Sequence, residues 1–200
     1  MAAEPPGSTL SPDKPRQGDR RVGSFRGPLE FIVTLFAAFI LVFGFVKPVV
    51  ADSRYIGSGS MAPTLKVGHG PLQKDRVLVN KLAYEFGEQE RGDIVLFESV
   101  EGGEDDLIKR VIAVEGDAVE LRRGILYLNG GRQEEPYLKR KPKDRRSFGP
   151  ETVPDGHVFM MGDNRTRSHD SRFFGPVPKE KLIGEAVLLY WPVGRAGRIQ

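Results

Sequence analysis

The sequence has no cysteine among its 200 residues, which excludes disulfide bonds, thiolate-bound metals and thiol nucleophiles. Its three histidines, His69, His157 and His169, leave little material for a histidine-ligated metal site. The formal net charge of +3 is small and gives no electrostatic reason to expect a nucleic acid or an acidic substrate. We therefore expect no metal, no cofactor and no nucleic-acid partner.

The composition divides the chain into three parts. Residues 1–28 are rich in proline, glycine and charge without an apolar period, which predicts a disordered tail. Residues 29–50, LEFIVTLFAAFILVFGFVKPVV, carry no charge from Phe31 to Val46, and a run of this length is typical of one membrane-spanning helix. Residues 51–200 form the third part, which we expect to be a single domain.

Three interpretations of the apolar run compete. A buried core helix would need partners on every face, and the β-rich remainder offers few. A cleaved signal peptide is suggested by the small-x-small sequence VVA at 49–51, but the run exceeds a usual signal-peptide core and follows a long tail. We favour an uncleaved anchor. Lys14, Arg16, Arg20, Arg21 and Arg26 precede it and few basic residues follow closely, which predicts a cytoplasmic tail and an exported domain.

Beyond the apolar run the pattern is typical of β-strands. Short stretches rich in Val, Ile, Leu and aromatic residues alternate with Gly, Asp and Asn. Asn129-Gly130 predicts the tip of a hairpin. We therefore expect a mainly β, antiparallel domain that forms a partly closed, barrel-like structure. The strand candidates are DRVLVNKLAY, GDIVLFESV, DLIKRVIAVEGDAVEL, GILYLNGG, HVFMMGD and LIGEAVLLYWP.

The segment GSGSMAPTL, residues 57–65, places Ser58 and Ser60 shortly after the apolar run. A serine hydroxyl is a poor nucleophile at neutral pH, so acyl transfer would need a base and donors for the oxyanion. One candidate base is His169, which has Asp170 beside it in TRSHDSR. Triad partners normally come from distant loops, and adjacent side chains tend to point apart, which makes this the weaker choice.

Lys109 is the second candidate base. It stands beside Arg110 in the apolar segment DLIKRVIAVEGD, and successive side chains of a strand face opposite sides. One of the two charges must therefore point inward. A lysine held against apolar atoms loses hydration, so its pKa falls and its neutral amine becomes a usable base, which arginine cannot do. Alternatively, Lys109 snorkels from an edge strand into water.

These segments resemble bacterial type I signal peptidases, the membrane-anchored serine–lysine proteases that remove signal peptides. The resemblance extends from Leu29 to Pro192 and excludes the tail. It implies a serine endopeptidase of the bacterial cytoplasmic membrane that cleaves preproteins after small-x-small sites, contacts membrane lipid and is monomeric. The matching segments, in order, are FVKP, SGSMAPTL, DRVLVNKL, RGDIVLF, KRVIAVEGD, LNG…EPYL and GDNRTRSHDSRFFGPVP.

The resemblance also implies residue roles. Ser60 would be the nucleophile and Lys109 the general base, with Ser168 orienting the lysine amine. The Ser60 backbone N–H and the Ser58 hydroxyl would form the oxyanion hole. A further set would support the site by ion pairing without taking part in the chemistry: Asp163, Asn164, Arg165, Asp170 and Arg172.

The substrate groove is expected beside the nucleophile. Ile56 and Met61 would line its two shallow apolar pockets, and the substrate would pair along it as an added strand. Gly57 departs from the family pattern, which usually has proline there; glycine leaves the approach to Ser60 less stiff.

Two other functions remain open at this stage. One is a self-cleaving Ser-Lys regulator, although the chain has an apolar run and no DNA-binding module. The other is a non-catalytic anchored β domain that binds envelope partners. The basic segment KRKPKDRR, residues 139–146, is interpreted as a solvated loop, with lipid headgroups as an alternative contact.

Overall fold

The structure is a computed structural model that describes residues 27–46, 50–70, 72–103, 105–138 and 144–199. The chain divides between Ala38 and Phe39 into two compact units. The predicted tail lies outside the described residues except for its last two positions, and so does Val49 of the VVA sequence. The domain boundaries at 28 and 50 stay predictions.

The apolar run is helical. It forms α1 (Pro28–Ile40) and then a π-helical segment, η1 (Leu41–Val46). Large apolar side chains of α1, such as those of Phe31 and Phe36, are 64% and 63% exposed. Among the helices that the structure describes, none has both the length and the apolar character needed to cross a membrane. The anchor over 29–50 therefore stays a prediction.

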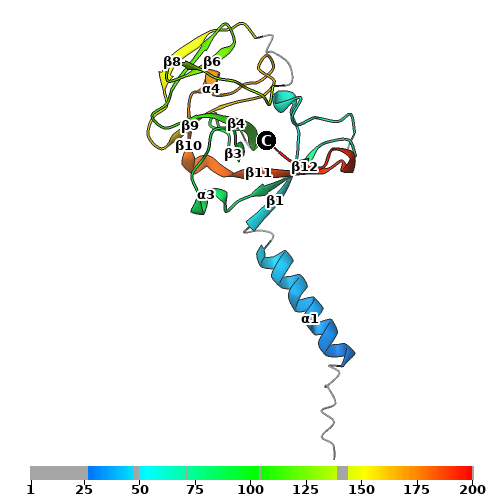
Figure 1. The fold of residues 1–200 in the computed structure, drawn as a ribbon. Coiled ribbons are helices and arrows are strands. Elements are labelled where there is room, and N and C mark those ends of the chain that lie inside the picture. The colour runs from blue at the N-terminus through cyan, green and yellow to red at the C-terminus, as the bar shows by residue number, and fades with distance from the viewer. Residues whose placement is uncertain (1–26, 47–49, 71, 104, 139–143, 200) are drawn as a thin grey trace, which may run out of the picture. The chain divides into compact units, whose positions relative to one another are not determined.

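The second unit contains an eight-stranded antiparallel sheet (Figure 1). Its strands are β1 (Ala51–Tyr55), β2 (Arg76–Asn80), β3 (Ile94–Phe97), β4 (Leu107–Val114), β9 (His157–Met161), β10 (Val177–Pro178), β11 (Leu182–Trp191) and β12 (Gly197–Arg198). The order is β1-β2-β11-β3-β4-β9-β10, and β12 pairs with β11. The predicted mainly β, antiparallel class is confirmed. Within the described residues the path ends at β1 and β10, which do not pair with each other, so the curled sheet is a half-barrel and not a closed barrel.

A smaller antiparallel sheet has the order β7-β6-β5-β8. It is built from β5 (Ala118–Arg122), β6 (Ile125–Leu128), β7 (Gly131–Arg132) and β8 (Phe148–Thr152). The predicted hairpin tip is confirmed, because Leu128 pairs with Gly131 across two residues of positive φ, Asn129 at 51° and Gly130 at 80°. Asparagine and glycine tolerate this conformation best.

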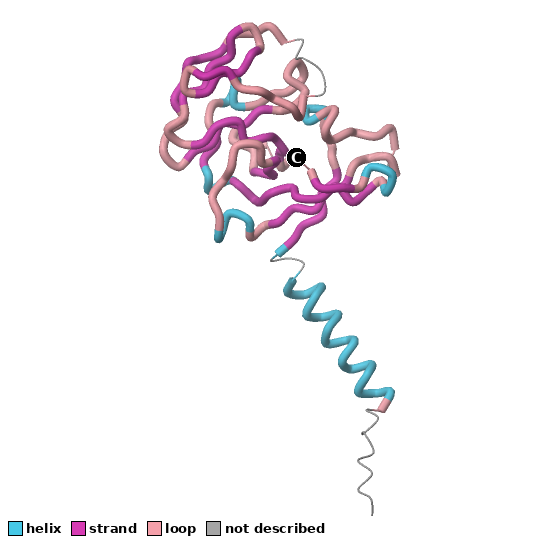
Figure 2. Tube along the Cα trace, viewed as in Figure 1, coloured by secondary structure: helices cyan, strands magenta, loops and turns pink. Residues whose placement is uncertain are grey.

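The described helices that follow β1 are short, and the tube view shows them as brief turns among strands and loops (Figure 2). They are α3 (Ala83–Phe86), α4 (Ser171–Phe174), η2 (Gly59–Met61), η3 (Lys179–Lys181) and η4 (Val193–Arg195). The predicted strand run DRVLVNKLAY is extended only to Asn80. The side-chain oxygen of Asn80 accepts a hydrogen bond from the Leu82 N–H, which turns the chain toward α3.

Both charges of β4 are buried, although the strand pattern predicted that only one would point inward. Lys109 is 2% exposed and Arg110 is 1% exposed. The reason is that β4 lies between β3 and β9 and carries apolar packing on both faces. Ile108 belongs to one core cluster and Val111 to another. The alternative of a lysine snorkelling from an edge strand is therefore wrong.

Candidate active site

The serine segment is folded into the short 3₁₀ turn η2, and Ser60 is 7% exposed at its centre. Asn164, in the loop after β9, holds this turn from outside. Its backbone N–H donates to the Ser60 carbonyl at 2.9 Å, and its side-chain amide donates to the Gly59 carbonyl at 3.0 Å. Two hydrogen bonds from one residue thus fix the backbone on which Ser60 stands.

Lys109 reaches Ser60 from the middle of β4. Its Nζ lies 3.0 Å from Ser60 Oγ and 3.1 Å from the Ile108 carbonyl oxygen. Burial lowers the pKa of Lys109 from its ordinary value of 10.5 to about 8, while the negative charge of Asp170 acts in the opposite direction. The arrangement joins a hydroxyl to an amine that loses its proton near neutral pH.

Ser58 lies beside this pair at one end of a cavity. Its Oγ is 3.0 Å from Ser60 Oγ. Ile56, 2% exposed, lines the cavity, whereas Met61 is fully buried in the core cluster that also contains Leu65. The groove roles of both residues stay predictions. The cavity has a volume of about 320 Å³ and is lined by Arg54, Tyr55, Ile56, Gly57, Ser58, Leu96, Asp105, Asp106, Leu107 and Ile108.

Ser168 is buried close to the serine turn. A Cβ atom placed on Gly162 would lie 2.3 Å from Ser168 Oγ and 2.5 Å from the Ser60 carbonyl oxygen, so these three residues are in close contact. In the described part of the chain no hydrogen bond of good geometry reaches Ser168 Oγ, yet Ser168 is near enough to Asp170 to help lower the pKa of that carboxyl. Proximity without alignment gives at most a weak hydrogen bond. The hydrogen bond expected between Ser168 and Lys109 is not formed in this conformation.

Arg110 and Asp163 form a buried ion pair beneath the site. Arg110 Nε and Nη2 lie 2.9 Å and 2.8 Å from the two Asp163 oxygens, with side chains 1% and 0% exposed. Thr64 donates to the same carboxylate at 2.5 Å, and the Tyr137 ring lies 4.0 Å from the guanidinium. The pair links β4 to the loop after β9. Each of the two charged groups has several partners, and these offset the free-energy cost of removing it from water.

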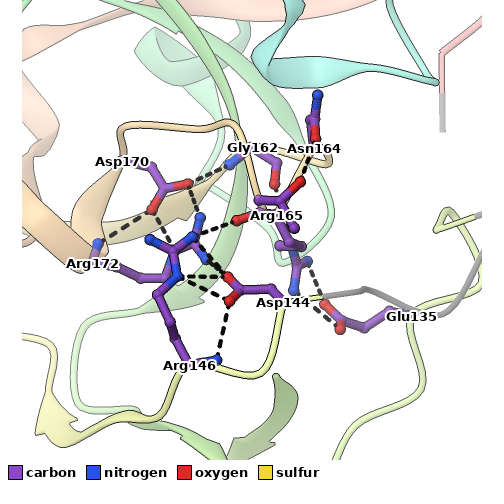
Figure 3. A network of polar contacts seen from close by, with 9 residues as sticks. Glu135, Asp144, Arg146, Gly162, Asn164, Arg165, Asp170 and Arg172 are labelled. Carbon is purple, nitrogen blue, oxygen red and sulfur yellow. Dashed lines mark hydrogen bonds and ion pairs between the residues drawn. The ribbon is translucent and has the colours of Figure 1, made fainter. Parts of the chain in front are cut away.

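Asp170 and Arg172 form a second buried pair, at the start of α4 (Figure 3). Arg172 Nε and Nη2 contact the two Asp170 oxygens at 2.7 Å and 2.8 Å, and the Gly162 N–H donates to Asp170 at 3.0 Å. Burial alone would raise the pKa of Asp170, but the hydrogen bonds and charge of Arg172 outweigh it and keep the pKa below its ordinary value. Asp170 therefore stays ionised.

The sequence did not reveal several partners in these networks. Asp144 and Arg146 belong to the segment interpreted as a solvated loop, but Asp144 is buried and contacts Arg172 at 2.8 Å. Residues 139–143 of that segment lie outside the described residues. Glu135 pairs with Arg165 at 2.5 Å, and Arg165 also donates to the Gly162 carbonyl at 3.2 Å. The one sequence feature that could have indicated a buried, ion-paired Asp144 is that it is the single acidic residue within KRKPKDRR.

The geometry does not support His169 as a base. Its Nε2 lies 2.9 Å from a Glu101 carboxylate oxygen, and its ring stacks on Phe173 at 5.1 Å between centroids. Its side chain is 58% exposed, and Asp170, its sequence neighbour, is engaged by Arg172. Within the described residues no group of three or more acidic or histidine side chains is placed to hold a metal ion.

The sequence matches the family model described as "Signal peptidase, peptidase S26" over residues 29–191. The chain belongs to this signal peptidase family. It is 39% identical to a probable signal peptidase I-2 of Synechocystis sp., over 84% of this chain and 76% of that protein. It is 38% identical to a signal peptidase I of Leptolyngbya laminosa, over 86% of this chain and 83% of that protein.

A further sequence relative and a solved structure are also similar to this chain. A signal peptidase IB of Staphylococcus aureus is 37% identical over 82% of this chain and 90% of that protein. Among solved structures, a signal peptidase I from Enterococcus faecalis V583 has 34% sequence identity, covers 49% of this chain and 96% of its own, and gives a TM-score of 0.44. The sequence matches show type I signal peptidase function and a serine endopeptidase, which confirms the resemblance.

Proposed function

We propose that this signal peptidase cleaves peptide bonds with Ser60 as the nucleophile and Lys109 as the general base. The observation that carries the proposal is the 3.0 Å distance between Lys109 Nζ and Ser60 Oγ, with both side chains buried. This distance is within the reach that proton transfer requires. Burial also favours the neutral amine, which is the form that can accept a proton.

The reaction follows from these positions. Neutral Lys109 accepts the Ser60 proton as Oγ attacks the substrate carbonyl, and the protonated amine then donates to the leaving nitrogen. Water, deprotonated by the same amine, releases the acyl group from Ser60. Ser58 Oγ, 3.0 Å from Ser60 Oγ, is placed to donate to the developing oxyanion together with the Ser60 N–H.

The supporting residues hold this pair in place. We assign Asp163, Asn164, Arg165, Asp170 and Arg172 to positioning rather than to the chemistry, because each binds backbone or another ionised side chain. Ser168 would orient the lysine amine after a side-chain rotation, for which its Oγ is free of competing hydrogen bonds of good geometry in the described part of the chain.

The substrate is proposed to be the cleavage region of a preprotein with its signal peptide. Its residues before the cut would extend along the cavity beside Ser58 and pair with its walls as an added strand. Signal peptides carry small residues at the first and third positions before the cut, which suits shallow pockets. Ile56 lines the cavity, and Met61 would act from the packed layer beneath it.

We further propose that residues 29–50 anchor a monomeric enzyme in a bacterial cytoplasmic membrane. The support is the apolar sequence of the run, the exposure of α1 side chains such as that of Phe31, and the basic residues that precede it. In this topology residues 1–28 stay in the cytoplasm, residues 51–200 face outward, and membrane lipid contacts the anchor.

The other two functions are less well supported. A self-cleaving regulator and a non-catalytic binding domain both disagree with a family match that covers residues 29–191. A purely binding function also does not explain the buried contact between Lys109 and Ser60.

The test is cleavage of a preprotein by the full chain in detergent, with the new N-terminus sequenced. We expect Ser60→Ala and Lys109→Ala each to lower the rate by at least about 10²–10⁴-fold without loss of folding. His169→Ala is the matched control and should retain activity. Wild-type turnover in Lys109→Ala together with an inactive His169→Ala would show that the base is histidine.

A further inference from the structure

Asp144 differs from the basic segment around it. It is the one acidic residue in KRKPKDRR, and its side chain is 7% exposed. It lies shortly before β8 of the smaller sheet, whereas Asp170 and Arg172 follow β9 of the larger sheet. Figure 3 shows the carboxylate of Asp144 meeting Arg172 from the side away from Asp170. The loop that leads into the smaller sheet thus supplies a charge to the network under the site.

The contacts form a chain of alternating charges. Arg146 Nη2 lies 2.8 Å from Asp144 Oδ2, and Arg172 Nη1 lies 2.8 Å from the same oxygen. The other two nitrogens of Arg172 bind Asp170. The Arg172 guanidinium is therefore divided between two carboxylates, and its side chain is 5% exposed. Little water is available to replace either contact.

Asp170, at the end of this series of charges, acts on the candidate base Lys109. Lys109 has Ser60 Oγ and the Ile108 carbonyl as hydrogen-bond partners, and Asp170 is the charge that acts on its amine. Ser168 lies between the serine turn and Asp170. Any change in how fully Arg172 neutralises Asp170 must alter the field at the Lys109 amine.

We propose that Asp144 is a positioning residue for Lys109: it shares Arg172 with Asp170 and thereby sets the negative charge that faces the lysine. The inference rests on the proposed Ser-Lys function. Removal of the Asp144 charge leaves Arg172 to Asp170 alone, which makes the surroundings of the amine more positive and favours its neutral form. Removal of the Arg172 charge has the opposite effect.

The experiment is the pH profile of kcat/KM for the full chain in detergent, with a peptide that spans a signal-peptide cleavage site. We expect the midpoint to move to lower pH in Asp144→Asn and to higher pH in Arg172→Gln. Asp144→Glu, which keeps the charge, should restore a midpoint close to that of the unmodified enzyme. Asp155→Asn, the same substitution at an exposed turn outside this network, is the control and should leave the midpoint unchanged.

A merely structural role would lower the unfolding temperature or the fraction of active enzyme, but it would not move the midpoint. An Asp144→Asn midpoint equal to that of Asp155→Asn, or one moved upward, overturns the inference even if Arg172→Gln fails to fold. That result would leave the proposed function intact, because the latter fails only if Ser60→Ala or Lys109→Ala retains activity.

Discussion

Cleavage should rise with pH along the titration of Lys109 and level off once the amine is neutral. Burial lowers the pKa of this amine to about 8, and Asp170 limits the shift. Only the neutral form can accept the Ser60 proton. A pKa near 8 makes about a tenth of the enzyme competent at pH 7, about half at pH 8 and nearly all above about pH 9.

The expected magnitudes separate a buried lysine from an ordinary one. The rate should increase about tenfold from about pH 6 to 7, about fivefold from about pH 7 to 8, and less than twofold beyond about pH 9. An unperturbed lysine would instead give about tenfold per unit up to about pH 9. A histidine base would level off near pH 7.

The assay is kcat/KM for a cleavage-site peptide, with single-turnover rates to establish that bond cleavage limits the reaction. Lys109→Arg serves as the control, because an arginine of similar length cannot lose its proton and should be inactive across the range. A profile that is flat from about pH 6 to 8 while chemistry is rate-limiting, or one that still climbs about tenfold between about pH 8 and 9, would refute the reasoning.

Three substitutions near Ser60 give further tests. Ser58→Ala should lower kcat by about 10²–10³-fold and leave KM nearly unchanged, since an oxyanion donor acts as charge develops; a raised KM with normal kcat would place Ser58 in ground-state binding. Gly162→Ala should lower activity strongly, because its Cβ would lie 2.3 Å from Ser168 Oγ and 2.5 Å from the Ser60 carbonyl oxygen. Gly57→Ala is the comparison: its Cβ would meet Tyr55 at 3.9 Å, so this variant should be active and equally or more heat-stable. Equal activities of the two glycine variants would contradict the close packing around Gly162.

The strands were predictable because their signals are local. Alternating apolar residues and the Asn129-Gly130 dipeptide fix a strand and its turn without distant contacts, and both are confirmed. The burial of both Lys109 and Arg110 was not predictable from one strand. It depends on β3, β9 and apolar layers on both faces of the sheet, none of which the segment itself encodes.

The candidate site shows the same distinction. The contact of Ser60 with Lys109 joins residues 49 positions apart and came from the resemblance of ordered motifs, not from periodicity. Asp144 and Arg172 lie 28 positions apart, one in the loop before β8 and the other in α4 after β9, so composition assigned Asp144 to a solvated loop. Ion pairs of this kind depend on how the two sheets meet, and a pattern of charges along the chain does not encode it.

The buried charges of the site divide into two kinds, and the difference bears on the proposed chemistry. Arg110, Arg165 and Arg172 each contact a carboxylate, so their charges are offset where they lie. Among the described residues, Lys109 Nζ contacts the neutral oxygens of Ser60 and Ile108, and the charge of Asp170 acts on it without a hydrogen bond between them. A carboxylate bound to Nζ would stabilise the ammonium, raise its pKa and remove the base. Because the folded pKa lies below the ordinary 10.5, the folded state gains stability as the pH rises from about 8 to 10.5, and at neutral pH burial of this amine costs on the order of 3 kcal/mol. The paired arginines tie together the elements that surround the lysine, and in the proposed mechanism the cost of burying its amine against the serine is what makes it available as a base.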